Sequence, residues 1–323
     1  MLRKQVIVTE QIHPVGIEIL AREVEVVRPP DLRPETLAGL IPGASGIVVR
    51  LAKVTADLLA RAERLEVIGK HGVGIDNIDV GAASVRGIPI VTTPNANDEA
   101  VAEHALTLML VLARQVRETE RGLRAGRFFP TRDGATIVDL AGKTLGIVGV
   151  GRIGARLAGI CSRAFAMRVL AFDPYVTPER AAELGVELRD LASLLAESDF
   201  VSVHTPLTSA TRGLIGAAEL AGMKRTAYLV NCARGGIVDE AALAEALEAS
   251  WIAGAGLDVF VSEPPDLGHP LYQLPNLVVT PHVAGGSQDA LELMARMIAD
   301  DVLRVLRGES GLNVANRGLL RMP

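Results

Sequence analysis

The stretch TLGIVGVGRIGARLA, residues 144–158, decides the fold class of this sequence. Its first residues form an apolar run that predicts a buried strand, and Gly149, Gly151 and Gly154 follow at a spacing typical of a tight turn that opens a helix. A strand, turn and helix of this kind usually begin a domain. Here they start almost halfway along a chain of 323 residues, so we expect the residues before Thr144 to form a separate unit.

Composition excludes some classes of protein. Hydrophobic residues make up 49% of the chain, which is enough for a substantial core, and the length favours two domains. The 33 Lys and Arg against 38 Asp and Glu give a net charge of -5 without a basic block. Nucleic acid is therefore not an expected partner.

Cysteine usage and the longest apolar runs indicate the compartment. Cys161 and Cys232 lie far apart and form no CxxC pair, so we expect neither a disulfide framework nor a metal site, and a reducing cytoplasm fits. The start MLRKQVIVTE lacks the apolar run of a signal sequence. The longest apolar run, Ala105–Ala113, falls short of the roughly 20 residues that cross a bilayer. We expect a soluble cytoplasmic protein with no membrane partner.

Short apolar runs alternate with helical patterns in two series. The strand-like runs of the first series are QVIVTE, VEVV, GIVVR, LEVIGK and IPIVTT. This alternation predicts right-handed crossovers and a parallel sheet. A long helix is then predicted from Asp98 to about Arg124, with one buried apolar stripe formed by Val101, Ala105, Leu108, Leu112 and Val116.

The second series has six strand-like runs: TLGIVGV, RVLAFD, FVSVHT, AYLVNCA, IAGAGLDV and LVVTPH. Six strands complete a dinucleotide-binding sheet, and one amphipathic helix, Asp289–Leu306, is left over. We therefore predict that the second domain is inserted into the first, on which the last helix packs. The predicted fold class is α/β with two doubly wound parallel-sheet lobes: a flavodoxin-like substrate domain, residues 1–98 plus 287–323, and a Rossmann dinucleotide-binding domain, residues 99–286.

The glycine turn predicts a dinucleotide cofactor. Gly149 permits the bend, Gly151 lets the backbone approach a pyrophosphate, and Gly154 allows close helix packing. The free N-H groups of the new helix, which begins with Arg152 and Ile153, face the anion. Asp173 ends the next strand, nineteen residues after Gly154. A carboxylate there accepts hydrogen bonds from the ribose hydroxyls of NAD and repels the extra phosphate of NADP, so NAD is the expected cofactor.

Other polar side chains also follow strands of the second series. His204 and His282 stand where the ligand crevice of an open α/β sheet lies. Arg234 can bind a carboxylate through two parallel hydrogen bonds, and Glu263 can pair with a histidine and favour its protonated form. Each residue alone also has a structural explanation, as a cap, a surface ion pair or a turn-shaping acid.

The motifs taken together resemble a known family. In chain order they are GKHGVGIDNIDV, TPNANDEAVAEHA, GKTLGIVGVGRIG, HTPLT, NCARGGIVDEAAL, GAGLDVFVSEPP and TPHVAGGS. This set is similar to that of the D-isomer-specific 2-hydroxyacid dehydrogenases. The resemblance implies an inserted NAD domain, an active site in the cleft, and hydride transfer between the nicotinamide and C2 of a 2-oxo or 2-hydroxy acid.

The resemblance implies catalytic roles for three residues. It assigns Arg234 to the substrate carboxylate and carbonyl, His282 to general acid and base catalysis, and Glu263 to orienting and charging that histidine. The first lobe supplies the implied substrate contacts of Val73 and Gly74, and Arg50 matches a substrate-facing arginine.

Cofactor contacts are implied for residues outside the glycine turn as well. Asp258 matches the position that holds the nicotinamide carboxamide, and His204 and Thr205 line the cofactor side of the cleft. Cys232 lies beside the cleft as a small buried residue and not as a nucleophile. His104, on the long helix, is expected to serve packing or a subunit contact.

The identity of the acid stays open at this point. GVGIDNID and TPNANDEAVAEHA are more similar to the phosphoglycerate dehydrogenase branch, and Arg50, Lys53 and Lys70 are candidate phosphate partners. However, Lys70 and His71 stand where that branch often has Arg-Ala, and the chain stops at Pro323, without the regulatory domains that many members append. The alternative is a hydroxypyruvate or glyoxylate reductase, or a dehydrogenase for another acidic D-2-hydroxy acid. Lys70 and His71 either contact a distal group of the substrate or face solvent.

The resemblance also bears on partners. It implies a homodimer in which the Asp98–Arg124 segment packs against its two-fold mate. NAD-sensing corepressors share the Arg, Glu and His, and they form a different functional class of binding proteins. They resemble this sequence less, because they carry extra terminal segments.

Overall fold

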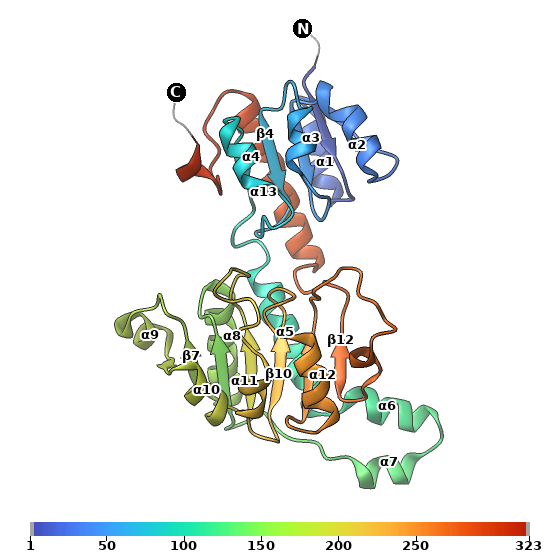
Figure 1. Cartoon of the computed structure of the whole chain (residues 1–323), viewed down its shortest axis with the longest axis vertical. Helices are drawn as coiled ribbons and strands as arrows, with labels where there is room; N and C mark the ends of the chain where they lie inside the picture. Colours follow the sequence, from blue (N-terminus) through green and yellow to red (C-terminus); the bar gives the residue numbers. More distant parts are fainter. Residues whose placement is uncertain (1–2, 321–323) are drawn as a thin grey trace. The chain divides into compact units, whose positions relative to one another are not determined.

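The computed structural model describes residues 3–320, and the chain divides into two compact units. Unit 1 comprises the described residues up to Asn97 and from Gly286 onward, and unit 2 comprises Asp98–Gly285 (Figure 1). Residues 1–2 and 321–323, which the predicted first domain includes, lie outside the described residues.

Unit 1 is built on a parallel sheet with the strand order β2-β1-β3-β4-β5. Its strands are β1 (Gln5–Val8), β2 (Glu25–Val27), β3 (Gly46–Val49), β4 (Val67–Lys70) and β5 (Ile90–Val91). Its helices are α1 (Pro14–Ala21), α2 (Pro34–Leu40), the 3-10 turn η1 (Ile41–Gly43), α3 (Ala56–Ala60), α4 (Val80–Val85), α13 (Gln288–Leu306) and the 3-10 turn η3 (Arg317–Leu319). This order is the flavodoxin-like one that the sequence predicts.

The last helix of the chain packs on the sheet of unit 1, as predicted. Helix α13 contacts α1 and β4. It approaches closely because β4 carries a glycine at the crossing point: a Cβ on Gly69 would lie 2.8 Å from a methyl of Val302. The tail after α13 is tied down as well, since buried Asp301 accepts hydrogen bonds from the amides of Leu312 (2.6 Å) and Asn313 (3.0 Å). The C-terminal segment is thus part of unit 1.

Unit 2 has an all-parallel sheet with the strand order β12-β11-β10-β9-β6-β7-β8. Its strands are β6 (Thr144–Val148), β7 (Arg168–Phe172), β8 (Glu187–Leu188), β9 (Phe200–Val203), β10 (Tyr228–Asn231), β11 (Gly254–Leu257) and β12 (Leu277–Val279). Its helices are α5 (Asp98–Ala113), α6 (Val116–Arg124), α7 (Phe128–Gly134), α8 (Arg152–Phe165), α9 (Pro178–Leu184), α10 (Leu191–Glu197), α11 (Ala217–Ala221), α12 (Glu240–Glu248) and the 3-10 turn η2 (Pro270–Gln273). The reversal of strand order beside β6 is that of the Rossmann fold.

Two details of unit 2 differ from the sequence prediction. The strand β8, Glu187–Leu188, extends the sheet to seven strands within residues 3–320, and it was missed because it contains no apolar run. The predicted continuous helix is interrupted at Gln115, whose φ of 48° lies in the left-handed region. Two helices, α5 and α6, therefore stand in its place.

The apolar stripe of helix α5 packs in the core of unit 2. Val101, Ala105, Leu108 and Leu112 are all buried in the core that also contains residues of β6 and β10. The packing on β11 is close, because a Cβ on Gly256 would lie 3.1 Å from the Cβ of Leu108. The predicted stripe is therefore confirmed for α5, while α6 and α7 project away from the sheet (Figure 1).

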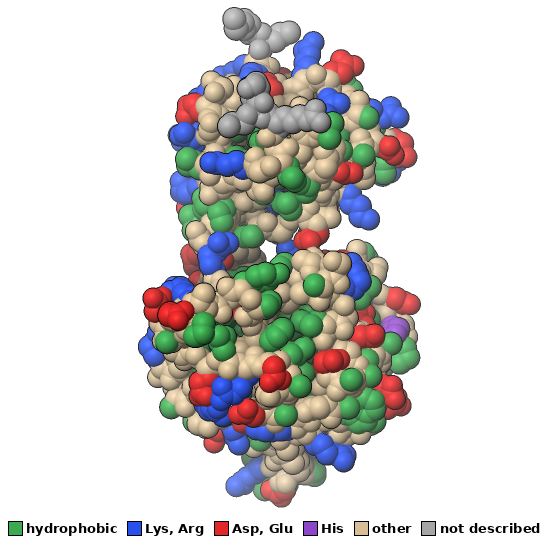
Figure 2. Space-filling model, turned by 60° about the vertical axis from the view of Figure 1, so that its left-hand side comes forward, with side chains coloured by type: hydrophobic (Ala, Val, Ile, Leu, Met, Phe, Trp, Pro, Cys, Tyr) green, Lys and Arg blue, Asp and Glu red, His purple; other side chains and the backbone are tan. Residues whose placement is uncertain are grey.

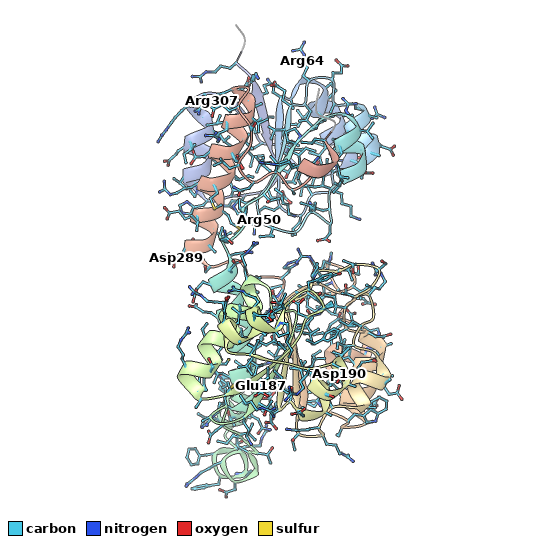
Figure 3. All side chains as sticks on the ribbon, turned by 90° about the vertical axis from the view of Figure 1, so that its left-hand side faces the viewer. Arg50, Arg64, Glu187, Asp190, Asp289 and Arg307 are labelled. Atoms are coloured by element: carbon cyan, nitrogen blue, oxygen red, sulfur yellow. The ribbon has the colours of Figure 1, made fainter. Side chains whose placement is uncertain are left out.

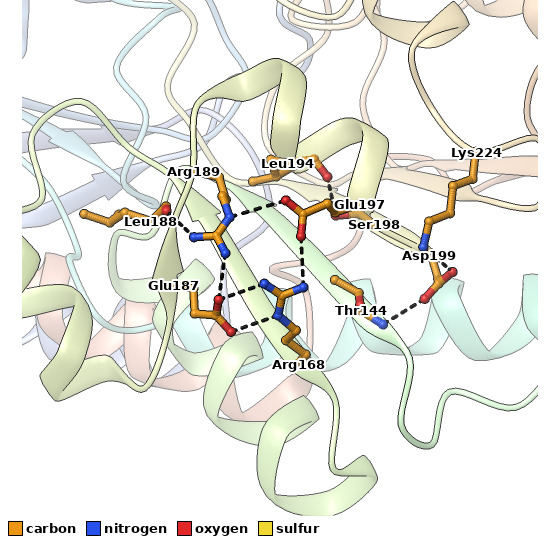
Figure 4. A network of polar contacts seen from close by, with 10 residues as sticks. All are labelled: Thr144, Arg168, Glu187, Leu188, Arg189, Leu194, Glu197, Ser198, Asp199 and Lys224. Carbon is orange, nitrogen blue, oxygen red and sulfur yellow. Dashed lines mark hydrogen bonds and ion pairs between the residues drawn. The ribbon is translucent and has the colours of Figure 1, made fainter.

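Charged side chains are distributed over the surface. On the face drawn in Figure 2, Lys and Arg side chains are interspersed with Asp and Glu side chains. An ion-pair network at the β8 edge of unit 2 is one example, in which Arg168 and Arg189 pair with Glu187 and Glu197 (Figure 4). No helix within residues 3–320 is long and apolar enough to cross a membrane.

Candidate active site

The glycine turn follows β6 directly and begins α8. Gly149 has a φ of 93°, and a Cβ on it would lie 2.9 Å from the carbonyl of His204. A Cβ on Gly154 would lie 2.3 Å from the carbonyl oxygen of Gly149. Both positions therefore require glycine, one for its conformation and both for close packing.

Gly151 differs from the other two glycines of the turn. Around the position that its Cβ would take, no atom of the described residues lies within 4 Å, apart from those of Gly151 itself and its neighbours along the chain. Gly151 is the residue before α8, and no side chain of the described part of the protein caps this helix start. The turn thus leaves open the space that a pyrophosphate takes in the nucleotide-binding fold, next to a helix N-terminus. The residues present fit a dinucleotide.

The two residues after Gly151 have different surroundings. The Arg152 side chain pairs with the carboxylate of Asp98 at 3.2 Å. Ile153 is partly buried against the core of unit 2. The backbone of both lies at the open helix start, and the Ile153 side chain anchors it.

Asp173 lies beside the turn, as its place after β7 predicts. Its carboxylate accepts hydrogen bonds from the amide of Val150, at 3.0 Å, and from the amide of Tyr175, at 2.9 Å. The negative charge is therefore held against the glycine turn itself. Pro174 and Tyr175, which follow, are exposed and uncharged, so no cation in these positions offsets the charge.

His204 and Thr205 follow β9 and run against the turn. The amide of His204 donates to the carbonyl of Val148 at 2.8 Å, and its ring Nε2 lies 2.8 Å from the Ser202 hydroxyl. Its Nδ1 is buried without a hydrogen-bond partner among the described residues. Burial lowers the pKa of the His204 ring to about 4, so the ring is neutral. An unpartnered buried ring nitrogen beside the turn fits a cofactor contact.

Cys232 and Arg234 follow β10. Cys232 is buried, and this burial raises the pKa of its thiol far above the usual range, so it is not a nucleophile. The loop of Arg234 lies against the segment after β11, because a Cβ on Gly235 would lie only 1.9 Å from the carbonyl oxygen of Phe260. The Asn231 side chain donates to the carbonyl of Arg234 at 2.9 Å and fixes the loop.

Glu263 and His282 form a direct pair. The Nδ1 of His282 lies 2.7 Å from Oε2 of Glu263, and the two side chains are 34% and 32% exposed. Burial by itself raises the pKa of Glu263, but the hydrogen bond and charge of His282, the amide of Phe260 and the charge of Arg234 outweigh it, and the pKa lies below its usual range. The carboxylate is thus charged and close to both Arg234 and His282. The three residues that the sequence singles out are brought together.

Asp258 holds the segment that carries His282. Its side chain is fully buried, and it accepts hydrogen bonds from the amides of Val283 at 2.9 Å and Ala284 at 2.8 Å and from the hydroxyl of Thr280 at 2.6 Å. Its carboxylate is therefore occupied by this segment, and the nicotinamide contact implied by the resemblance stays a proposal.

In unit 1, Arg50 follows β3 in a loop whose amides are hydrogen-bonded to a side chain of the same unit. The carboxylate of Glu10 accepts hydrogen bonds from the amides of Arg50 (2.8 Å), Leu51 (2.6 Å) and Ala52 (2.6 Å). Burial raises the pKa of Glu10, but these bonds and that from the Thr9 hydroxyl outweigh it, so its pKa lies below 4.5. Figure 3 shows Arg50 at the end of unit 1 opposite to Arg64.

Lys70 and His71 are buried, so of the two alternatives that the sequence leaves open for them, exposure to solvent does not apply. The Lys70 ammonium donates to the carbonyl of Arg50 and, at 2.6 Å, to the side-chain oxygen of Asn77. Burial and the nearby Arg50 charge lower the pKa of His71 to about 4, and neither of its ring nitrogens has a partner among the described residues. Lys70 thus supports the Arg50 loop from within unit 1.

The two other predicted substrate contacts lie in the loop after β4. Val73 is 39% exposed and Gly74 is partly buried. The loop is fixed to the segment after β5 by the amide of Thr93, which donates to the carbonyl of Gly72 at 3.0 Å. Its backbone is thus presented on the same edge of the sheet as Arg50, because both loops follow parallel strands.

The sequence did not point to Glu10, Asn77 or Thr280. It predicted that His104 serves packing or a subunit contact. Glu10 follows β1 and Thr280 follows β12, so their positions at strand ends were the available signal. His104 contacts Thr280 with its Nε2 at 2.9 Å. Within residues 3–320, no group of three or more His, Cys, Asp or Glu side chains is arranged to hold a metal ion.

A cavity of about 550 Å³ lies elsewhere in unit 1, between α2 and α3. Its walls include Leu37, Leu58 and Arg61, together with Lys53. Lys53 is the one candidate phosphate cation among the residues that line it.

Comparison with known proteins identifies the family. The model of the D-isomer specific 2-hydroxyacid dehydrogenase NAD binding domain matches residues 106–284. The chain belongs to this family. It is 41% identical over 314 residues to the D-3-phosphoglycerate dehydrogenase of Archaeoglobus fulgidus, covering 97% of this chain and 59% of that protein. The chain thus spans about three fifths of the length of that relative.

Other relatives match the chain end to end. It is 41% identical over 333 residues to the glyoxylate reductase of Aeropyrum pernix, covering 100% of this chain and 98% of that protein. A solved structure of a Thermus thermophilus protein has 38% identity and a TM-score of 0.87, covering 96% of this chain and 99% of that chain. The solved structure of the D-lactate dehydrogenase of Aquifex aeolicus complexed with NAD and lactic acid has 30% identity and a TM-score of 0.86. The match covers 94% of this chain and 96% of that chain. The fold, two parallel-sheet α/β domains with a Rossmann NAD-binding domain, is confirmed.

Proposed function

We propose that this protein is an NAD-dependent D-2-hydroxyacid dehydrogenase, and that its substrate pair is 3-phosphohydroxypyruvate and D-3-phosphoglycerate. The observation that carries the reaction class is the Glu263–His282 pair at 2.7 Å beside the Arg234 loop, on the domain with the open glycine turn. The similarity to the phosphoglycerate dehydrogenase of Archaeoglobus fulgidus supports the substrate.

The residues divide the chemistry as follows. The turn from Gly149 to Gly154 and Asp173 would hold NADH, which when bound would supply the hydride for C2 of the 2-oxo acid. Arg234 binds the carboxylate of the acid and polarises its carbonyl group. His282 delivers a proton to the carbonyl oxygen as it becomes an alkoxide, and Glu263 stabilises the protonated ring that does so.

A hydroxypyruvate or glyoxylate reductase is the second candidate. The glyoxylate reductase of Aeropyrum pernix matches over 98% of its own length. In addition, Lys70 is buried and donates to Arg50 and Asn77, which removes it from the candidate phosphate partners. Arg50 and Lys53 are left for that role.

Turnover with a panel of 2-oxo acids and NADH tests the proposal. We expect a higher kcat/KM for 3-phosphohydroxypyruvate than for hydroxypyruvate, glyoxylate or pyruvate. Replacing Arg50 with Gln should raise KM for the phosphorylated acid about 10-fold to 100-fold and leave hydroxypyruvate nearly unaffected, because a charge-assisted bond is lost. Preference of the wild type for an unphosphorylated acid selects the second candidate. Tight NADH binding without turnover of any acid indicates a sensor and contradicts both.

The protein also acts as a homodimer in this proposal, through α6 and α7 and not through α5. The stripe of α5 is buried in unit 2, whereas Val116, Leu123, Phe128 and Phe129 are exposed on the two following helices. Exposed apolar side chains grouped in this way are typical of subunit contacts. Light scattering should give the dimer mass for the wild type and the monomer mass for Phe129→Asp. A monomeric wild type at micromolar concentration contradicts the proposal.

A further inference from the structure

The hydroxyl of Thr280 lies between two polar groups of unit 2. Its oxygen is 2.6 Å from Oδ1 of Asp258 and 2.9 Å from Nε2 of His104, which comes from α5. A hydroxyl has a single hydrogen, and Oδ1 of Asp258 is an acceptor, since it also accepts from the amide of Val283. Thr280 therefore donates to Asp258 and accepts from His104, which carries its hydrogen on Nε2. The chain of hydrogen bonds runs in one direction, from His104 through Thr280 to Asp258.

The other end of this chain of bonds is the backbone at His282. The carboxylate of Asp258 accepts from the amides of Val283 and Ala284, and its main-chain carbonyl accepts from the amide of His282 at 2.8 Å. His282 has a φ of 53°, in the left-handed region that residues other than glycine rarely adopt. Hydrogen bonds to the side chain and to the main-chain carbonyl of Asp258 hold His282 in this conformation.

Asp258 is fully buried, so its carboxyl oxygens need these hydrogen-bond donors. Without the Thr280 hydroxyl, the carboxylate loses the donor of its shortest hydrogen bond among the described residues. His104 also places its ring nitrogen 3.6 Å from the same carboxylate oxygen. The orientation of Asp258 therefore depends on α5, although α5 contributes no residue to the Glu263–His282 pair.

We propose that His104 and Thr280 are positioning residues for His282: through Asp258 they fix the turn that aims its imidazole. This inference rests on the proposed function, in which His282 transfers the proton. His104 and Thr280 act through Asp258 and are assigned no contact with the substrate. Misplacement of a reacting group by a fraction of an ångström to about 1 Å lowers the chemical step more than it lowers binding.

Matched pairs of variants test the proposal by turnover. Thr280→Val keeps the shape and removes the hydroxyl, and Thr280→Ser keeps the hydroxyl. We expect kcat to fall about 10-fold to 100-fold in Thr280→Val, with the dissociation constant of NADH changed less than about 3-fold, and to recover in Thr280→Ser. His104→Leu should lower kcat and His104→Gln, which keeps a donor, should restore most of it. Thr107→Val, the same change at an exposed position of α5, is the control and should match the wild type.

A second measurement does not depend on turnover. In protein with 15N-labelled histidine, the ring signals of His282, assigned by their loss in His282→Gln, report whether the ring keeps its bond to Glu263. We expect these signals to shift and broaden in Thr280→Val and His104→Leu and to stay in place in Thr280→Ser and Thr107→Val. Unchanged His282 signals in Thr280→Val, or equal kcat in Thr280→Val and Thr280→Ser, overturn the proposal. Absence of wild-type turnover with every acid refutes the proposed function instead, and the ring signals still decide the positioning role.

Discussion

Two loops of this protein occupy the same kind of position in their sheets but differ in what binds their backbone amides. The Arg50–Ala52 loop follows β3 in unit 1, and the Gly149–Gly154 turn follows β6 in unit 2, each at the carboxyl end of a parallel strand inside its sheet. In the first, three successive amides bind the carboxylate of Glu10. In the second, no side chain of the described residues caps α8, and the space beside Gly151 is open.

The difference lies in which anion satisfies the amides. Glu10 belongs to the chain, so the first loop is complete on folding and Arg50 is presented from a fixed backbone, supported by Lys70. The second turn leaves its helix N-terminus to an anion from outside, which suits a dinucleotide. A nest of amides that the protein fills itself thus serves to place a side chain, and one that it leaves open serves to bind a ligand.

Gly151→Val is expected to have the largest effect, because it closes the open turn. The backbone of Gly151, with φ of -65°, tolerates a side chain and the position has free space, so the melting temperature should hold. The valine takes the volume that the pyrophosphate needs, and the dissociation constant of NADH, measured by fluorescence titration, should rise roughly 100-fold or more.

Gly39→Val is the control for this substitution. Gly39 also has no neighbouring atom within 4 Å in the described part of the chain, but it lies in α2 of unit 1. NADH binding should be unchanged in this variant. If Gly151→Val binds NADH as the wild type does, the open turn is not the pyrophosphate site.

Glu10→Gln tests the Arg50–Ala52 loop, whose amides bind the Glu10 carboxylate. An amide side chain keeps one acceptor but removes the charge that binds the three amides, so we expect a loss of about 1–2 kcal/mol in the free energy of unfolding of unit 1 at pH 7. Because the pKa of Glu10 is lowered in the folded state, its contribution is present above the usual value of 4.5 and is lost as the pH falls through the lowered pKa. The difference between the variant and the wild type should therefore shrink in acid, as denaturant unfolding at several pH values will measure.

The matched variant for Glu10→Gln is Glu66→Gln. Glu66 pairs with Lys4 at 2.6 Å, but both side chains are 41% exposed. Solvent screens such a pair, and the stability should change little. A loss in Glu66→Gln as large as that in Glu10→Gln contradicts the view that the bound amides make the difference.

The sequence predicted what depends on local pattern and missed what depends on contacts between distant segments. The long strands were predicted because apolar runs mark buried parallel strands, and Asp173, His204, Arg234 and His282 were singled out as candidates because ligand sites lie at strand ends. The strand β8 was missed because it has no apolar run. No local signal marks the left-handed backbone of Gln115, which interrupts the predicted helix.

The supporting contacts were beyond local pattern for the same reason. The bond of Glu10 to the amides after β3 joins residues forty positions apart, and that of His104 to Thr280 joins residues 176 positions apart. Each exists only once two distant segments of the chain have been brought together by the fold. The pairing of particular side chains with distant groups is therefore the information that local sequence pattern did not display.

Asp173→Ser should have a smaller effect than these, confined to the choice of cofactor. The wild type should prefer NADH over NADPH, because the carboxylate stands against the glycine turn and repels the extra phosphate. Without the charge, the ratio of kcat/KM for NADPH to that for NADH should rise about 10-fold. Asp173→Asn keeps an acceptor for the Val150 amide and should give the same shift, which separates charge from turn geometry. Equal use of the two cofactors by the wild type contradicts the role of Asp173.

Arg168→Met should change least, although Arg168 has more ionic partners than Glu10 (Figure 4). Its guanidinium donates to Glu187 at 2.8 Å and to Glu197 at 2.9 Å, and the hydrogen bond from Arg168, more than the charges around it, lowers the pKa of Glu187 to about 2. The side chains are 42%, 48% and 39% exposed, however, so water and salt screen the charges.

Arg189 also pairs with both glutamates and remains in this variant. We therefore expect a loss in the free energy of unfolding, measured in urea, that is smaller than the loss in Glu10→Gln and that vanishes in about 1 M salt. A larger loss than in Glu10→Gln, or one that persists at high salt, would show that exposed ion pairs at the sheet edge stabilise this protein more than carboxylates bound by backbone amides do.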